Sequence, residues 1–245
     1  MRCDPSRIQF NCNPAQRRSS RIVVGISLIA ASMSAVRCPV CEHFLEETSA
    51  ACRGCGFSLP LADAHYGACP QATARVSDHA GLLTRGARAA LMKAGIEFEQ
   101  RFPGLRLTVL VHELPPGVPR RPYLFWMFNR CGLHTAIEKG GANRHVLLWI
   151  DPGELQVSAM VGYGLEPLVS EELLSQVLEA AVTPMKTGQW AQAGLAFIGV
   201  LDSALADLQS RLPAIFGWFP EETWTALEED FDPMEKGLTS GAVVY

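Results

Sequence analysis

Four cysteines near the start of the chain stand in two pairs, and each pair has two residues between its members. The pairs are Cys38 with Cys41 and Cys52 with Cys55, and ten residues separate them. Two intervening residues let one tight turn direct both sulfurs at the same ion, and Zn²⁺ in structural sites takes four thiolates in a tetrahedron. The spacing therefore predicts a structural zinc site, in a pattern typical of short zinc ribbons at the N-terminus of bacterial proteins. Because protein fills all four coordination positions, such a site has no open position for chemistry.

A redox pair or a disulfide is the other chemistry that paired cysteines support. A redox C-x-x-C usually begins a helix after a strand in a thioredoxin-like unit, and the sequence around these cysteines predicts no such unit. Disulfide scaffolds spread their cysteines through a small secreted chain, so the paired spacing favours metal. His43 and His65 could substitute as ligands, but four cysteines already complete the set. Of the scattered cysteines, Cys69 is interpreted as a bystander and Cys131 as a core residue.

The residues that follow the cysteine pairs have the pattern of a separate domain. Apolar residues at helical spacing alternate along the chain with short runs rich in β-branched residues. An Asp-Pro-Gly turn at residues 151–153 is expected to join the last two strands as a hairpin. The order of elements indicates an α/β domain, or an α+β one, in which helices pack against a sheet. The pattern predicts helices over residues 84–102, 123–131, 170–184 and 188–212, with Pro184 ending the third, and strands over 105–112, 144–150 and 155–161.

Composition divides the chain into five segments. The linker is assigned from Pro60, Gly67 and Pro70. The residues before Met33 show no helix or strand period and are interpreted as a disordered or spurious extension, with translation beginning at Met33. The alternative is an export signal, because residues 17–34 have a basic start, an apolar run and then small residues. The protein is expected to be cytoplasmic, or periplasmic if residues 17–34 are a signal. The segments are an N-terminal extension over 1–33, a zinc ribbon over 34–59, a linker over 60–75, the α/β domain over 76–212 and an acidic, aromatic tail over 213–245.

Charge and hydropathy limit the classes of partner. The net charge is −4 and no basic face is clustered in the sequence, which argues against nucleic-acid binding. No stretch is expected to reach the roughly 18 apolar residues of a membrane-spanning helix, so no integral membrane segment is predicted. In the tail, Trp224, Leu227 and Phe231 share one face of a predicted amphipathic helix among acids. That helix is expected to dock on the protein's own domain, or alternatively to meet a partner or a second copy.

Five short segments of the main domain resemble, in order, the motifs of the TPM domain family. Residues 76–83, Val-Ser-Asp-His-Ala-Gly-Leu-Leu, look like the family's opening V-x-D-x-A-G-x-L. Residues 161–166 match its V-G-Y-G-L-E element, and residues 184–193 resemble its P-x-F-+-x-G-x-Y-x-x-A segment. Gly132-Leu133 follows a short aromatic helix as the W-G-I-G element does, and residues 146–151 resemble the N-G-V-L-L-L strand. Together the resemblance covers about residues 76 to 210.

The resemblance implies two classes of function, because TPM proteins are implicated in photosystem repair, in accessory roles to membrane complexes and, in some cases, in acid phosphatase activity. The first is a hydrolase. Asp78, Asp151 and Glu166, beside the backbone N–H groups of Gly162 and Gly164, would hold Ca²⁺ or Mg²⁺ through oxygen ligands. The cation would polarise a phosphoryl oxygen and activate water. The second class is a binding or assembly module for a protein complex.

Departures from the family motif favour the binding module. The family's D-N-G before the central strand is here Asn143-Arg144-His145, so an amide replaces a carboxylate and a positive charge lies beside the proposed cation site. Asn143 stays a candidate for contact with a bound ion. Arg144 would repel a cation, although it could grip a phosphate. His145 precedes an apolar strand and is interpreted as a strand residue with a satisfied side chain.

Each of the three acids also has a structural interpretation. Asp78 could be a turn residue at a helix entry, Asp151 the first residue of a plain Asp-Pro-Gly turn, and Glu166 a solvated surface acid. We therefore expect an accessory binding module, bearing a zinc ribbon, that meets an unknown protein partner through the ribbon or the tail. A divalent-cation-dependent hydrolase similar to acid phosphatases is the alternative.

Overall fold

The computed structural model describes residues 35–46, 49–72, 74–133 and 143–216 of the 245-residue chain. The expected extension over 1–33 and nearly all of the expected tail over 213–245 lie outside the described residues. The chain separates into two compact units, Met1–Asp202 and Ser203–Tyr245. The sheet, the cysteine pairs and the pocket described below all belong to the first unit.

A four-stranded mixed sheet forms the centre of the first unit, in the order β3-β4-β5-β6. The strands are β3 (Val76–Asp78), β4 (Arg106–Val111), β5 (His145–Asp151) and β6 (Gln156–Val161). The pairs β3–β4 and β4–β5 are parallel, whereas β5 and β6 form an antiparallel hairpin. The expected sheet with helices against it is thereby confirmed, and its mixed topology places the domain in the α+β class.

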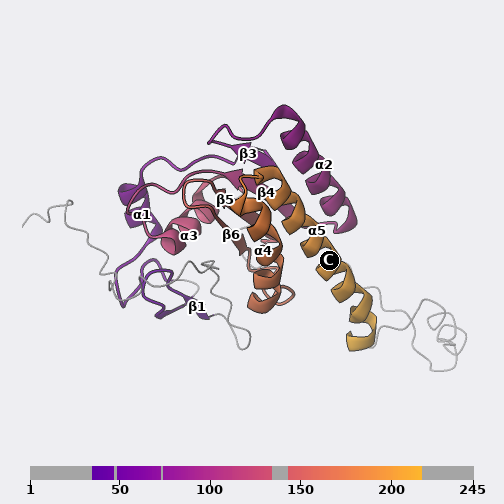
Figure 1. Cartoon of the computed structure of the whole chain (residues 1–245). Helices are drawn as coiled ribbons and strands as arrows, with labels where there is room; N and C mark the ends of the chain where they lie inside the picture. Colours follow the sequence, from indigo (N-terminus) through magenta and orange to yellow (C-terminus); the bar gives the residue numbers. More distant parts are fainter. Residues whose placement is uncertain (1–34, 47–48, 73, 134–142, 217–245) are drawn as a thin grey trace, which may run out of the picture. The chain divides into compact units, whose positions relative to one another are not determined.

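Helices lie on both sides of this sheet (Figure 1). Leu147 and Trp149 of β5 join a hydrophobic cluster with α3 (Arg120–Arg130) and α1 (Leu59–Tyr66). On the opposite side, the Cα of Gly194 in α5 (Trp190–Phe216) comes so close that a Cβ there would lie 3.8 Å from Ile150 Cδ1. All seven residues of β5 are buried, because a strand covered on both faces has no solvent side.

Two of the helices begin within one residue of the predicted start, each behind a polar cap. Thr84 Oγ1 accepts a hydrogen bond from the N–H of Ala87 (3.1 Å) at the start of α2 (Arg85–Arg101). Ser170 Oγ accepts from the N–H of Leu173 (3.2 Å) at the start of α4 (Glu171–Lys186). Each side chain satisfies a backbone donor that the first turn of a helix leaves without an intrahelical partner.

The expectation that Pro184 ends α4 is wrong. The helix continues to Lys186 and ends where Thr187 and Gly188 turn, with Gly188 at a φ of 72°. A proline lacks an N–H to donate and its ring crowds the preceding turn, but its carbonyl can still accept a hydrogen bond. Here the carbonyl of Pro184 accepts from the N–H of Gln189 (2.9 Å), so the last turn stays closed.

The segment over residues 60–75, expected to be a linker, instead begins with helix α1. Ser58 caps this helix by accepting from the N–H of Leu61 (3.3 Å), and Pro60 lies in its first turn. Gly67 follows its last residue with a φ of 78°. Proline is favoured near the start of a helix and glycine just after its end. Pro60 and Gly67, which suggested a linker, therefore mark the two ends of an eight-residue helix.

Among the described residues, helix α5 is the one helix long and apolar enough to be a candidate membrane span. The candidate stretch Trp190–Arg211 has 22 residues, and its 18-residue test window has a mean hydropathy of 1.3 with 33% buried within the protein. Length and composition alone would allow this stretch to cross a membrane. At its start, however, a Cβ on Gly194 would lie 2.7 Å from Leu91 Cδ2 of α2, which shows that this turn packs closely within the first unit.

Candidate metal centre and pocket

Two tight turns of the same shape present the four cysteines. The first lies between β1 (Ala35–Arg37) and β2 (Phe44–Glu46), which pair antiparallel. In it the N–H of Glu42 donates to the carbonyl of Cys38 (3.0 Å), and in the second turn the N–H of Gly56 donates to the carbonyl of Cys52 (2.8 Å). Both donors have a positive φ, 62° at Glu42 and 78° at Gly56, so the first turn carries a strain that glycine relieves in the second.

The four sulfurs form a donor set of the right size for one metal ion. All lie within 4.8 Å of one another, and the Sγ pairs Cys38–Cys55 and Cys41–Cys52 are 3.5 Å apart. Thiolates at about 2.3 Å from a tetrahedral ion lie about 3.8 Å from each other, so the positions of the four sulfurs fit one tetrahedrally bound metal ion. The predicted set of cysteines is thus brought together, and neither His43 nor His65 belongs to it.

The ribbon and α1 lie against one face of α3. Cys38 and Cys52 belong to the same hydrophobic cluster as the buried residues of α3. Asp63 of α1 accepts hydrogen bonds from Trp126 Nε1 (2.8 Å) and from Arg130 Nε (2.9 Å). The hydrogen bond with Arg130 is the main reason that the pKa of Asp63 is lowered. Cys38 and Cys52 of the candidate metal site are therefore part of the core of this unit, whereas Cys41 and Cys55 are exposed.

Asp78, one of the three candidate cation ligands, holds the chain where it enters α2. Its carboxylate accepts hydrogen bonds from the N–H groups of Gly81 (2.8 Å) and Leu83 (2.8 Å), and Arg88 lies 3.7 Å away. The side chain of Asp78 is fully buried. These contacts are those of a turn residue at a helix entry, which is the structural interpretation that the sequence allowed.

Asp151 is also committed to contacts within the protein. It is fully buried and forms an ion pair with Arg120 of α3, whose side chain is 6% exposed. Its Oδ1 accepts from the N–H of Gly153 (3.1 Å) in the expected turn. The Arg120 guanidinium also meets Glu154 (2.9 Å) and lies over the Trp149 ring, 4.5 Å from its centroid.

The three acids do not form one cation site, so that expectation is wrong. Asp78 and Asp151 lie at the carboxyl ends of the parallel strands β3 and β5, which share one edge of the sheet. Strand β6 runs back, and its last residue, Val161, pairs with Val146 at the opposite end of β5. Five residues of strand, about 17 Å, separate that position from Asp151. Glu166 follows Val161 and therefore belongs to the other edge of the sheet.

At that other edge, the Val-Gly-Tyr-Gly turn wraps around Asn143. The N–H of Gly164 donates to the carbonyl of Asn143 (2.8 Å), and Asn143 Oδ1 accepts from the N–H of His145 (3.1 Å). A Cβ on Gly162 would lie 2.4 Å from the carbonyl oxygen of Asn143, so only glycine allows this approach. His145 is buried and its Nε2 is 2.9 Å from Thr108 Oγ1, which confirms a satisfied strand histidine.

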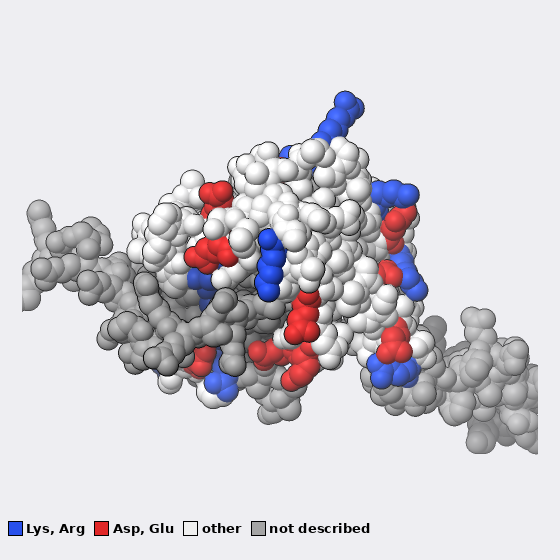
Figure 2. All heavy atoms as spheres, in the orientation of Figure 1, with Lys and Arg blue, Asp and Glu red and all other residues white. Residues whose placement is uncertain are grey.

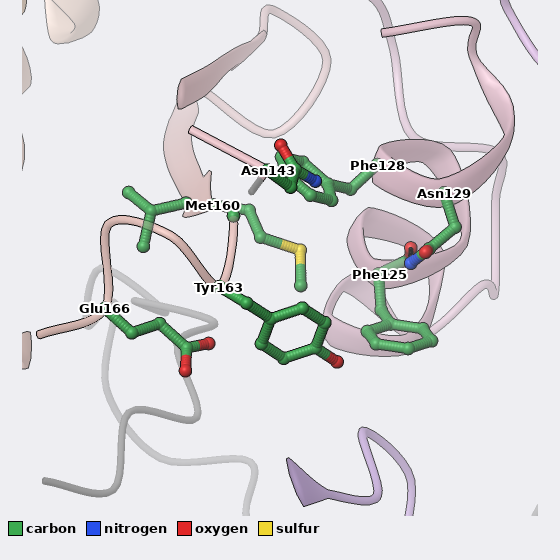
Figure 3. A pocket seen from close by; sticks show the side chains of 9 residues that line it. Phe125, Phe128, Asn129, Asn143, Met160, Tyr163 and Glu166 are labelled. Atoms are coloured by element: carbon green, nitrogen blue, oxygen red, sulfur yellow. Dashed lines mark hydrogen bonds between the residues drawn. The ribbon is translucent and has the colours of Figure 1, made fainter. Parts of the chain in front are cut away.

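A pocket of about 160 Å³ lies beside this turn. Figure 3 shows Phe125, Phe128 and Asn129 of α3 on one side of it and Tyr163 and Glu166 on the other. The sequence indicated Asn143, Gly162 and Glu166 but not the residues from α3, because the helix joins the site only through the packing of the fold. The aromatic run of the predicted helix over 123–131 was the available signal. The lining residues are Phe125, Phe128, Asn129, Asn143, Met160, Val161, Gly162, Tyr163 and Glu166.

Burial raises the pKa of Glu166 from its ordinary 4.5 to about 7. At neutral pH this carboxyl group is therefore protonated in a large fraction of molecules, and a protonated carboxyl donates a hydrogen bond instead of holding a cation. Glu166 is the one acid that lines the pocket among the described residues. The pocket can consequently accept an apolar group and exchange hydrogen bonds with it through Glu166 and the amides of Asn129 and Asn143.

Glu166→Gln should stabilise the protein at alkaline pH. Between pH 4.5 and about 7 the folded state binds more protons than the unfolded one, so the free energy of unfolding falls as pH rises through this range. Glutamine does not titrate, and the variant should gain on the order of 1–3 kcal/mol relative to wild type between about pH 5.5 and about pH 8.5. Chemical denaturation at both pH values measures the difference. An advantage of equal size at the two pH values would show that Glu166 is not the titrating group.

Charged side chains are interspersed by sign on the face of the molecule that Figure 2 displays. Some exposed charged residues form surface ion pairs, such as Lys93 with Glu97 (3.7 Å), whose side chains are both well exposed. Such pairs each contribute little to stability. The pocket, with its aromatic lining, differs in chemistry from this surface.

The model of one protein family, the TPM domain, matches residues 76–204. No curated protein matches the chain. Solved structures found to be similar to this chain include the solution NMR structure of the N-terminal domain of a P. gingivalis protein, at 20% identity and a TM-score of 0.48 over 56% of this chain and 86% of that one. The N-terminal domain of a Corynebacterium glutamicum protein has 15% identity and a TM-score of 0.43 over 54% and 80%. The BA42 protein of Bizionia argentinensis has 17% identity and a TM-score of 0.44 over 54% and 86%.

Proposed function

Because this chain belongs to the TPM domain family, we propose that it is an accessory module for a protein complex, with a pocket that binds a partner and a zinc ribbon packed beside it. The pocket would take a bulky apolar side chain from an exposed segment of the partner. Affinity would come from burial of that side chain among the pocket's aromatic residues, and orientation from the amides and the Glu166 carboxyl group.

The composition of the pocket is the observation that carries this proposal. Five of its nine described lining residues have apolar or aromatic side chains, namely Phe125, Phe128, Met160, Val161 and Tyr163. Glu166, the one acid among these described residues, has a pKa near neutrality. A hard cation needs several oxygen ligands in exchange for its waters. Asp78 and Asp151 are instead bound by backbone N–H groups and arginines at the other edge of the sheet. A binding pocket agrees with this arrangement better than a cation-dependent hydrolase.

Zinc is the ion we propose for the ribbon. Four thiolates in a closed tetrahedral set favour a soft or borderline metal over Ca²⁺ or Mg²⁺, and zinc needs no redox partner. The metal would hold the two cysteine turns in place and leave no position for substrate. Thiols that bind zinc persist in a reducing compartment, which supports a cytoplasmic location.

Selection from a displayed peptide library on the purified, zinc-loaded full chain tests the proposed pocket. Selected peptides should be enriched in one large aromatic or aliphatic residue with polar neighbours. A parallel selection on Tyr163→Ala should lose this enrichment, because Tyr163 lines the pocket and is 39% exposed, so its removal leaves the core intact. Leu168→Ala is the matched control, since Leu168 is 41% exposed nearby but does not line the pocket. The same enriched sequences on Tyr163→Ala would contradict the proposal.

The alternative function is a hydrolase similar to acid phosphatases, and one observation favours it. A carboxyl group with a pKa of about 7, such as Glu166, is able to donate a proton to a leaving group. Cation-dependent hydrolysis of a phosphate ester that is present in the wild type and lost in Glu166→Gln would support this alternative.

A further inference from the structure

We propose that the metal centre positions the wall of the pocket, with Phe57 as the positioning residue between them. The effect on partner binding rests on the proposed function of the pocket, whereas the coupling between ribbon and helix does not. The contacts themselves run from the second cysteine turn to Phe57, then to Phe125 of α3, which lines the pocket. Loading of the ribbon with metal would therefore set the shape of a binding site that contains none of the cysteines.

The second cysteine turn fixes Phe57 directly. The N–H of Cys52 donates to the carbonyl of Phe57 (2.8 Å), and this bond closes the turn that carries Cys52 and Cys55. The Phe57 side chain is buried. A ribbon of this size has little core of its own, so its turns depend on the metal for their stability. Loss of the metal would release the backbone that holds the Phe57 ring.

Phe57 contacts the helix that forms one wall of the pocket. Its ring meets that of Phe125 edge to face, with centroids 6.0 Å apart. Such contacts fix the relative orientation of two rings. Phe125 lines the pocket together with Phe128 and Asn129, which lie one turn farther along the same helix (Figure 3). The backbone of Phe57 is therefore bonded to the second cysteine turn, while its ring contacts a residue that lines the pocket.

The first cysteine turn reaches the same face of α3. Glu42, which follows Cys41, forms an ion pair with Arg121, four residues before Phe125. Residues four apart lie on one face of a helix, so the two turns contact adjacent points. Glu42 is 62% exposed and its pair with Arg121 contributes little free energy. Phe57 is the stronger of the two contacts.

A third contact with α3 does not involve the metal. Asp63 of α1 binds Trp126 and Arg130 through side-chain hydrogen bonds. These bonds should keep α3 attached when the ribbon loses its ion. The expected effect is therefore local opening of the part of α3 around Phe125, and not loss of the helix.

Hydrogen exchange of the full chain, followed by mass spectrometry, tests this coupling. Removing zinc from wild type with a chelator should raise amide exchange in residues 121–129 by at least about tenfold, because local opening is then easier. Phe57→Ala should keep its zinc and show the same increase, and Phe57→Leu should restore most of the protection. Phe44→Ala is the matched control, since this phenylalanine of the same ribbon is 54% exposed and touches Arg37 instead.

Unchanged exchange over residues 121–129 in the chelated wild type would overturn the proposal, whatever the variants do. An equal increase in Phe44→Ala would also overturn it, because the effect would then be a general loosening of the ribbon. The exchange measurement needs no ligand, so it can succeed when the peptide selection fails. The coupling of the ribbon to α3 and the binding function of the pocket can therefore be refuted independently.

Discussion

Replacing Cys38 and Cys55 together by serine should remove nearly all bound zinc and cause the largest loss of stability among the substitutions considered. A tetrahedral site that loses two of its four thiolates no longer holds the ion. Because Cys38 also belongs to the buried cluster that includes α3, the released ribbon exposes apolar surface of that helix. We expect a loss of several kcal/mol in the free energy of unfolding, which is part of the roughly 10–16 kcal/mol that zinc binding contributes to isolated fingers.

Metal analysis and thermal unfolding measure the two consequences. Wild type should carry about one zinc per chain, and the double variant almost none, with the sheet still folded by circular dichroism. Cys69→Ser is the control, because this cysteine lies outside the donor set and should change neither the zinc content nor the midpoint by much. Full zinc content in the double variant would mean that the cysteines are not the ligands.

Arg120→Met should lower the free energy of unfolding by about 3–5 kcal/mol, the second large effect we expect. The substitution leaves the Asp151 carboxylate fully buried without its ion-pair partner. The hydrogen bonds from the turn to Asp151 remain, but they do not replace a positive charge. The cation–π contact with Trp149 is lost at the same time. Chemical denaturation of the purified variant measures the change.

Two further variants separate the buried charge from other causes. Arg121→Met changes the next residue of α3, whose ion-pair partner Glu42 is 62% exposed. It should lower the free energy of unfolding by less than about 1 kcal/mol. Combining Arg120→Met with Asp151→Leu should recover much of the loss, because no unpaired charge stays buried. A double variant as unstable as Arg120→Met alone would show that packing, and not charge, accounts for the loss.

Most of the fold follows from local sequence patterns, and two elements that were not predicted, β3 and α1, were missed for local reasons. The apolar run of β5, the caps Thr84 and Ser170 and the turn after Asp151 give elements whose bounds agree with the structure to within a few residues. Strand β3 was missed because it has three residues, too few for a periodicity. Helix α1 was missed because Pro60 and Gly67 indicate both a loop and the two ends of a helix.

Part of the candidate site follows from the spacing of residues in the sequence, and the rest depends on how the helices pack on the sheet. The cysteines lie close together in sequence, so their spacing alone predicted the cluster. The three acids were grouped wrongly, although the predicted hairpin implied that Glu166 lies at the opposite edge from Asp151. The ion pair of Asp151 with Arg120 joins residues 31 apart, and no sequence pattern connects them. The same is true of Phe125, which enters the pocket from α3.

If the pocket beside Asn143 binds a partner's side chain, the affinity of a selected peptide should depend on the residues that line the pocket. Isothermal titration should give a dissociation constant at least about tenfold weaker for Tyr163→Ala than for wild type, since about 1.4 kcal/mol is a modest contribution for a lining aromatic residue. Leu168→Ala should bind as wild type does. Equal dissociation constants for wild type and Tyr163→Ala, in proteins of equal stability, would show that the peptide does not bind in this pocket.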